Sequence, residues 1–388
     1  MLAVVRDAGA GVHHSVLDVL ADHLEVVWGA LVAFVVVVLL TPAVGGMARM
    51  LGVVDAPGGR RVNRSPVPRL GGVALFLGIF VPALAFLPLS RDTRGLLLGG
   101  AVAVTVGAID DFRGLRWWEK LAGQVLAAAV PTWFGVWVDR FTFPLVGVHA
   151  LPGWVGVPLT IVWIVAIMNM VNFLDGLDGL AAGVAGIAGL TFAIIALSLA
   201  KPEAAILSAI VFGACLGFLR HNFYPARIFM GDSGALLLGF VLATVSVQGL
   251  LKTAATVALF FPLLVLAVPI VDTTFVVARR LKHREKVFEA DQAHLHHRFL
   301  RRGFSEPRAA VTIWAWCLSL AVAALGTRFI PFRAHGVWHL WPTVAAAALG
   351  GVALAFSVYV VYVLEIVKVG NRIYRRRAQG DPLKKSAA

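Results

Sequence analysis

Long apolar segments alternate with short polar clusters along almost the whole chain. A helix needs about 17–25 apolar residues to cross a bilayer, and a helical span satisfies its own backbone hydrogen bonds. The alternating segments of about ten residues that are typical of a membrane barrel are absent from the pattern. We predict eleven membrane-spanning helices, over residues 25–48, 70–89, 95–109, 120–138, 156–172, 179–200, 203–219, 233–250, 254–278, 309–327 and 340–367.

The same pattern divides the chain into three parts. Residues 1–24 form an extracytoplasmic N-terminal segment, residues 25–367 form one multi-span membrane domain, and residues 368–388 form a basic cytoplasmic tail. The cationic, His-rich connection 279–308 is expected to hold a short amphipathic element or a hairpin. The connection 139–155 contains Pro and Gly and little charge, which predicts a compact turn.

Composition supports an all-α integral membrane protein. The chain is 59% hydrophobic and only 14% charged, with a mean hydropathy of +0.85, whereas soluble domains have about 25% charged residues. Both cysteines, Cys215 and Cys317, fall inside predicted spans, so no disulfide framework is indicated.

The distribution of Lys and Arg predicts the orientation. With the N-terminus outside, 26 of the 34 basic residues lie on the cytoplasmic side, as the positive-inside rule requires. The net charge of +13 is therefore explained by topology and by anionic lipid or phosphate, and no nucleic-acid partner is needed. This topology brings six polar clusters to one membrane face: Asp55–Arg69, Gly107–Lys120, Asn169–Asp178, Arg220–Asp232, Arg279–Arg308 and the tail from Lys368.

Two of these clusters combine carboxylates with other polar groups. Asp110 and Asp111 end the third span, where the helix dipole disfavours anions, so a cation or a phosphate chemistry that needs a base explains them better than a solvated helix end. Lys120 begins the next span, either as a phosphate contact or as an interfacial lysine. Polar residues then recur every third position around Gly176, which predicts an interrupted turn. Carboxylate and amide oxygens are the ligands that Mg²⁺ prefers, so a metal-binding turn explains this pattern better than a solvated cytoplasmic turn does. These residues are Asn169, Asn172, Asp175 and Asp178.

Two further clusters offer phosphate contacts. Asp232 opens the eighth span, where it can cap the helix, hold a metal on a diphosphate, or do both. Asn222, shortly before it, offers a donor. The long inner loop carries His294, His296, His297 and Arg298, which suit recognition of phosphate or sugar hydroxyls better than a solvated loop or a zinc site. Asp272 is an intramembrane acid and a weaker functional candidate.

Together these motifs resemble the polyprenyl-phosphate N-acetylhexosamine-1-phosphate transferase superfamily, glycosyltransferase family 4. The resemblance covers about residues 40–325 and rests on GAIDD (107–111), NMVNFLDGLDGLAAG (169–183), GFLRHNFYPARIFMGDSG (217–234) and HLHH (294–297). The HLHHR sequence is similar to the WecA/TagO-like branch, since the MraY branch has consecutive His residues there. Asn63 is a departure, because family members often carry His at this position.

The resemblance implies an activity and roles for residues. N-acetylhexosamine-1-phosphate, here GlcNAc-1-phosphate, would pass from a UDP-sugar to polyprenyl phosphate, releasing UMP and initiating a cell-envelope glycan. Asp232 would hold Mg²⁺ (or Mn²⁺) with Asn172 as a second ligand, and Asp110 and Asp111 would orient or deprotonate the lipid phosphate. The remaining residues would contact the nucleotide, sugar or phosphate: Lys120, Asn169, Asp175, Asp178, Asn222, His294, His296, His297 and Arg298.

The resemblance places this protein in the bacterial cytoplasmic membrane with its active site on the cytoplasmic face, and a homodimer is an open expectation. Two alternatives stay open. One is phospho-MurNAc-pentapeptide transfer within the same superfamily. The other is a secondary transporter, which would place its charges near the membrane midplane; here they lie at the inner ends of spans, apart from Asp272.

Overall fold

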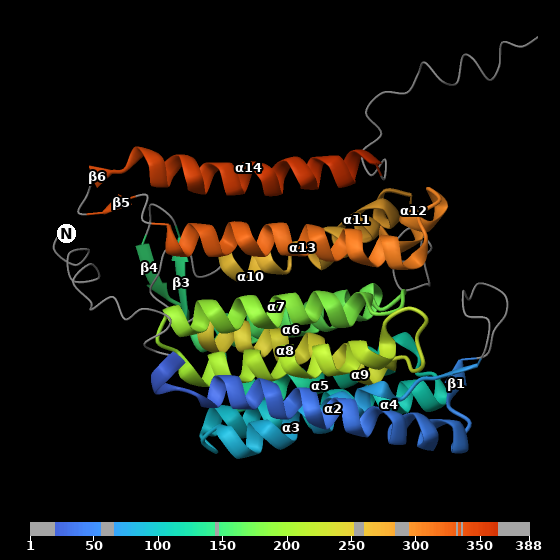
Figure 1. The fold of residues 1–388 in the computed structure, drawn as a ribbon. Coiled ribbons are helices and arrows are strands. Elements are labelled where there is room, and N and C mark those ends of the chain that lie inside the picture. Colours follow the sequence, from blue (N-terminus) through green and yellow to red (C-terminus); the bar gives the residue numbers. More distant parts are fainter. Residues whose placement is uncertain are drawn as a thin grey trace, which may run out of the picture.

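The computed structural model describes residues 20–55, 66–143, 147–251, 260–283, 295–330, 333–334 and 337–363, and these are almost entirely helical. The helices run side by side as one bundle (Figure 1), which confirms the all-α prediction. They are α2 (Glu25–Met50), α3 (Gly71–Phe86), α4 (Arg91–Arg113), α5 (Trp117–Trp133), α6 (Gly153–Leu174), α7 (Leu180–Ser198), α8 (Pro202–Asn222), α9 (Gly231–Val245), the π-helix η2 (Ser246–Leu251), α10 (Phe260–Val265), α11 (Ala267–His283), α12 (Leu295–Arg301), α13 (Glu306–Phe329) and α14 (Leu340–Val363).

Every predicted span corresponds to one or more of these helices. By length and composition, eight helices within the described ranges can cross a membrane, and Gly71–Phe86 and Ala267–Val277 are shorter apolar helices. This chain is therefore a multi-pass membrane protein. Residues 1–19 and 364–388, which include most of the predicted N-terminal segment and the whole basic tail, lie outside the described residues.

The spans that differ from their predicted form include α4 and the predicted span 254–278. Helix α4 begins at Arg91, four residues before the predicted start, because the Ser90 side chain caps it by accepting a hydrogen bond from Thr93 N (3.2 Å). An apolar window misses such a polar first turn. The predicted span 254–278 is divided into α10 and α11 where the structure describes it, so one apolar run contains two helices.

Among the described residues, three short antiparallel strand pairs lie between the helices. They pair β1 (Val54–Asp55) with β2 (Val67–Pro68), β3 (Arg140–Phe143) with β4 (Gly147–Ala150), and β5 (Arg333–Ala334) with β6 (Val337–Trp338). In the longest of them Arg140 lies opposite Ala150. The compact turn predicted over 139–155 thus contains a hairpin, and the short element predicted in the His-rich connection is α12.

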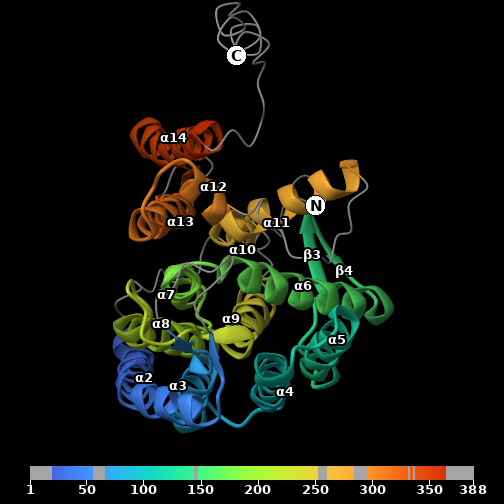
Figure 2. The same cartoon turned by 90° about the vertical axis from the view of Figure 1, so that its right-hand side faces the viewer.

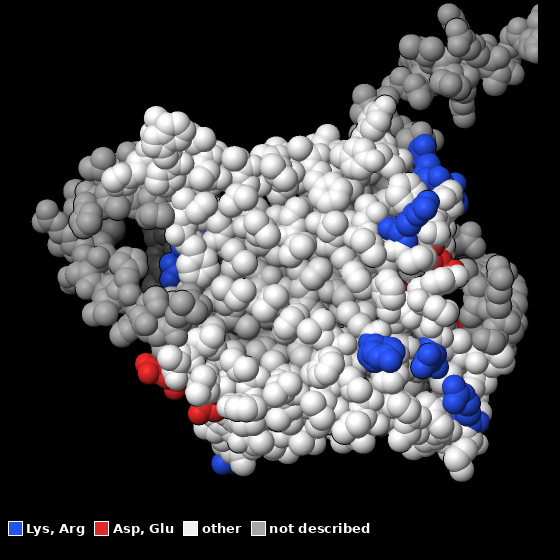
Figure 3. All heavy atoms as spheres, viewed as in Figure 1, with Lys and Arg blue, Asp and Glu red and all other residues white. Residues whose placement is uncertain are grey.

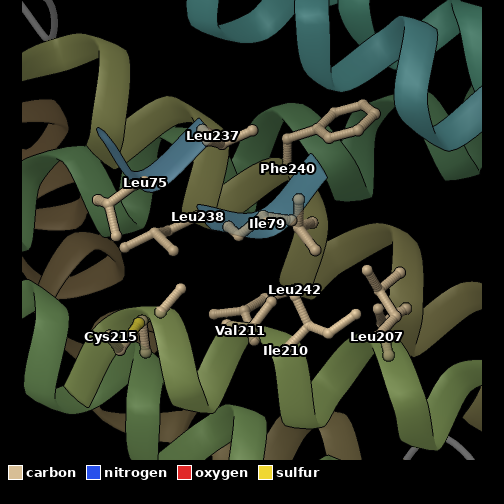
Figure 4. Close-up of a cluster of buried hydrophobic side chains, with 14 of the residues drawn as sticks. Leu75, Ile79, Leu207, Ile210, Val211, Cys215, Leu237, Leu238, Phe240 and Leu242 are labelled. Atoms are coloured by element: carbon tan, nitrogen blue, oxygen red, sulfur yellow. The ribbon is translucent and has the colours of Figure 1, made fainter. Parts of the chain in front are cut away.

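Helix α9 lies at the centre of the bundle. The span Gly231–Gln248 is 89% buried inside the protein, whereas the most apolar window of α14 is only 11% buried. Figure 2 looks along the bundle and shows α9 enclosed by neighbouring helices while α14 lies at the periphery. The core around α9 includes Leu237, Leu238 and Phe240 together with side chains from α3 and α8 (Figure 4). A buried α9 holds its first residues in one place, and these include Asp232.

Charge is concentrated at the ends of the helices. On the face shown in Figure 3, most Lys and Arg side chains gather at one end of the bundle, the end where α12 and β1 lie in Figure 1, and the broad middle is uncharged. The described parts of the polar clusters that were predicted to share one membrane face meet at this end, as the contacts below demonstrate.

Candidate active site

The side chain of Lys120 lies at the centre of the candidate site. Its Nζ is 2.9 Å from Asp110 Oδ2 and 2.9 Å from Asp232 Oδ2, and it donates to Asn172 Oδ1 at 3.2 Å. These residues come from the end of α4, the start of α5, the end of α6 and the start of α9. Three oxygen-bearing side chains separated by up to 122 residues in the sequence therefore surround one cation.

Local structure orients each of these groups. Asn172 Nδ2 donates to Asp232 Oδ1, which holds the two side chains together. Asp110 Oδ1 accepts a hydrogen bond from Leu115 N (2.6 Å), beyond the Gly114 turn that ends α4. One oxygen of Asp110 is thus fixed by the backbone, and the other faces Lys120.

Asp111, the next residue on α4, has different partners from Asp110. Its carboxylate is fully buried and accepts hydrogen bonds from Asp232 N (2.9 Å) and from Ser233 N (3.0 Å) and Oγ (2.9 Å). Arg69, 33% exposed, places Nη2 3.4 Å from Asp111 Oδ1. The adjacent acids of the Gly107–Lys120 cluster therefore have different surroundings, one beside Lys120 and one at the start of α9.

Asn169 lies about one turn before Asn172 on α6 and pairs with Gln124 of α5. Its Nδ2 donates to Gln124 Oε1 (2.8 Å), and Gln124 Nε2 donates back to Asn169 Oδ1 (3.2 Å). Sequence reasoning missed Gln124, which is buried. Its position four residues after Lys120, on the same face of α5, is the signal that could have revealed it. The role of Asn169 in nucleotide binding stays a prediction.

The predicted interrupted turn joins α6 to α7. Asp178 Oδ2 accepts from Ala226 N (2.8 Å), while Asn222 Oδ1 accepts from Gly179 N (3.1 Å) and its Nδ2 donates to Ile228 O (2.9 Å). Asn222 and Asp178 thus tie this turn to the connection between α8 and α9. Both ends of the Asn222 amide are used by backbone groups, and its predicted contact with nucleotide stays a prediction.

Asp175, in the same turn, has a strongly altered acidity. Burial, followed by the negative charges of Asp232 and Asp111, raises the pKa of Asp175 to about 8. Burial also raises the pKa of Asp178, against the lowering effect of the Ala226 N–H. Burial and the neighbouring carboxylates therefore favour the protonated form of Asp175, and a cation held nearby would favour its charged form.

The His-bearing helix α12 packs against this turn. The ring of His296 is buried over Gly176, where a Cβ would overlap the imidazole, and it contacts the His297 ring in a tilted arrangement, with 4.2 Å between centroids and 45° between the planes. Arg298 lies 4.4 Å above the Phe275 ring. Asp272, the intramembrane acid, is buried and its Oδ1 accepts from Leu295 N (2.8 Å), so it caps the start of α12.

His294 and Asn63 lie outside the described residues. The structure brings the other candidate residues to one end of the bundle, in two adjoining groups. One surrounds Lys120, and the other is the turn after α6 with α12 packed on it.

The oxygen groups around Lys120 fit a magnesium ion. Within the described residues no group of three or more His, Cys, Asp or Glu side chains could hold a metal. Mg²⁺ does not require such a cage, because it usually binds through one or two carboxylates, with phosphates and water completing its shell. The carboxylate of Asp232 and the amide oxygen of Asn172 meet that requirement at a place already built to enclose a cation.

Comparison with known proteins gives a consistent result. Residues 93–250, which contain most of the site, match the family model of glycosyl transferase family 4. A probable undecaprenyl-phosphate N-acetylglucosaminyl 1-phosphate transferase from Bacillus subtilis is 35% identical over 78% of this chain and 85% of its own length. A decaprenyl-phosphate N-acetylglucosaminephosphotransferase from Mycobacterium tuberculosis is 35% identical over 84% and 86%.

A second group of relatives is named for the transfer of a different sugar phosphate. A phospho-N-acetylmuramoyl-pentapeptide-transferase from Desulforudis audaxviator is 33% identical over 78% of this chain and 98% of its own length. The resemblance inferred from the motifs is thereby confirmed over most of the chain. This chain belongs to glycosyl transferase family 4, the polyprenyl-phosphate phosphosugar transferases.

Proposed function

We propose that this protein transfers GlcNAc-1-phosphate from UDP-GlcNAc to a polyprenyl phosphate at the cytoplasmic face of a bacterial inner membrane. An oxygen of the lipid phosphate forms a bond with the β-phosphorus, and the bond from that phosphorus to the UMP oxygen breaks. The products are polyprenyl-diphosphate-GlcNAc and UMP. The observation that carries the proposal is the convergence of Asp110, Asn172 and Asp232 on Lys120 at one end of the bundle.

Two anionic substrates must approach each other, so neutralisation of charge is the main task of the site. Asp232 and Asn172 would hold the metal, and Mg²⁺ when bound would neutralise charge on the diphosphate. Lys120 is held by two carboxylates in the ligand-free protein, and we infer that it turns to a substrate phosphate. This proposal therefore includes magnesium dependence.

Asp110 has one oxygen available for this chemistry. Its Oδ1 is used by Leu115 N, so Oδ2, which faces Lys120, is the atom that would orient the acceptor phosphate or take its proton. His296, His297 and Arg298, carried by α12 against the turn of Asp175, would contact the sugar phosphate. Three residues of α12 are buried where it packs: Leu295, His296 and Phe299.

The experiment measures UMP release by purified protein supplied with undecaprenyl phosphate, Mg²⁺ and one UDP-sugar at a time. We expect UMP from UDP-GlcNAc and none after chelation of divalent ions. UMP from UDP-MurNAc-pentapeptide alone would assign the protein to the second group of relatives. The absence of UMP from every nucleotide sugar tested would refute the proposal and favour the transporter alternative.

A further inference from the structure

Asp111 lies beside the predicted base, yet its carboxylate is turned into the protein. Its side chain is 0% exposed, whereas that of Asp110 is 10% exposed. Oδ1 accepts from Asp232 N, and Oδ2 accepts from both the N–H and the hydroxyl of Ser233. Both oxygens of Asp111 are therefore engaged by groups of the protein.

These donors sit at the start of α9. The first backbone N–H groups of a helix have no partner inside that helix, and an acceptor placed there stabilises its positive end. The residue before α9, Met230, supplies no side-chain cap. Asp111 supplies the cap instead, from α4 and across 121 residues of sequence.

Close packing keeps this cap in position. Gly231 adopts φ +69°, and a Cβ there would overlap the Asp111 carboxylate. A Cβ on Gly107, one turn earlier on α4, would overlap the backbone of Ser233. The glycines thus let the start of α9 approach α4 closely, and the Asp111 carboxylate contacts the backbone of Asp232 directly, so a change in this carboxylate acts on that backbone.

We infer that Asp111 is a positioning residue that fixes the start of α9 and so aims Asp232 at Lys120 and Asn172; it does not act as a base on the acceptor lipid. The backbone N–H of Asp232 donates a hydrogen bond to Asp111, while the Asp232 carboxylate contacts Lys120 and Asn172. The inference rests on the proposed function, in which Asp232 holds the metal. Residues that orient metal ligands typically change metal affinity or activity by about 10- to 100-fold when they are altered.

The test compares Asp111→Asn with its neighbour Asp110→Asn. Mn²⁺ affinity is measured by electron paramagnetic resonance in the presence of UDP-GlcNAc and without lipid acceptor, so that no turnover occurs. Asn offers one acceptor oxygen where Asp111 offers two. We expect Asp111→Asn to weaken Mn²⁺ binding about 10- to 100-fold and to raise the Mg²⁺ concentration for half-maximal UMP release by a similar factor. Its kcat at saturating Mg²⁺ should stay within about tenfold of wild type, whereas Asp110→Asn should reduce kcat much further with little change in Mn²⁺ affinity.

Ser233→Ala provides a milder version if Asp111→Asn fails to fold. It removes one hydrogen bond to Asp111 and leaves both backbone donors, so we expect Mn²⁺ affinity to fall about two- to tenfold with kcat preserved. A loss of kcat at every Mg²⁺ concentration with unchanged Mn²⁺ affinity, in either variant, would overturn the inference and make Asp111 part of the chemistry. If the wild-type protein neither binds Mn²⁺ nor releases UMP, the proposed function itself has failed, which is a distinguishable result.

Discussion

Replacement of Gln124 by Leu tests the role of the Asn169 side chain. This amide either holds α5 and α6 together through Gln124 or contacts the nucleotide. Gln124 is 1% exposed, and it exchanges two hydrogen bonds with Asn169, at 2.8 and 3.2 Å. Asn169 Nδ2 also donates to Val165 O (2.8 Å). In Gln124→Leu the donor of Asn169 therefore keeps a partner, and its Oδ1 is the group that loses one.

The magnitude follows from these two bonds. Hydrogen bonds between membrane helices contribute about 0.6 kcal/mol on average and at most about 1.7 kcal/mol, and a buried group left unpaired costs about 1–3 kcal/mol. We expect Gln124→Leu to lower the free energy of unfolding by about 1–3 kcal/mol. The double variant Gln124→Leu/Asn169→Leu should cost about 1–2 kcal/mol less than the sum of the single changes, since it leaves no unpaired amide.

The two single variants and the double variant form a double-mutant cycle, which needs two kinds of measurement. Reversible unfolding in mixed micelles gives the stabilities, and UMP release gives the KM for UDP-GlcNAc. A structural pair predicts that both single variants change KM to the same extent, because each loosens the α5–α6 contact that carries Lys120 and Asn172. Additive stabilities, together with a KM increase in Asn169→Leu alone, would refute the reasoning and make Asn169 a nucleotide contact.

Three further predictions concern neighbouring groups. Lys120→Met leaves two facing carboxylates without their cation, so kcat should fall by about 10²–10³ while Mn²⁺ affinity rises; unchanged kcat would contradict this. Gly176→Ala should displace the His296 ring and raise the KM for UDP-GlcNAc about tenfold, the size of effect seen when residues that support a binding site are altered. Gly350→Ala is the control, because a Cβ there would contact nothing, and it should have no effect. The folded-state pKa of Asp175 is about 8, above its unfolded value, so its ionisation opposes folding. In the absence of divalent ions, the melting temperature of Asp175→Asn minus that of wild type should therefore increase from about pH 4 to pH 8 and then stay level. A difference that does not change with pH would refute this.

The sequence was informative where a single property, such as the length of an apolar segment, determines the structure. Apolar length predicted the helices, and the excess of carboxylates and amides at their polar ends predicted which side chains meet. Asp110, Asn172 and Asp232 were singled out because charge and amide groups at the end of an apolar span need a partner. The structure brings all three to Lys120.

The sequence was less informative where a contact depends on packing between distant helices. Asp110 and Asp111 are identical in type and adjacent, and only the position of α9 separates one that faces Lys120 from one that caps a helix. The pairing of Gln124 with Asn169 needs the rotation of two helices about their axes, which a hydropathy pattern does not provide. Asp272 looked like a functional intramembrane acid because the helix that it caps lies in a different segment.

The most direct test of the account is UMP release by Asp232→Ala in isolated membranes supplied with UDP-GlcNAc, lipid phosphate and Mg²⁺. Several kcal/mol of charge stabilisation are assigned to the metal that Asp232 would hold, so we predict a loss of about 10²–10³ or more in rate. Asp22→Ala, which removes an exposed carboxylate before α2, should match wild type. UMP release by Asp232→Ala at the wild-type rate would contradict the central claim that these oxygens gather around a metal-bound diphosphate.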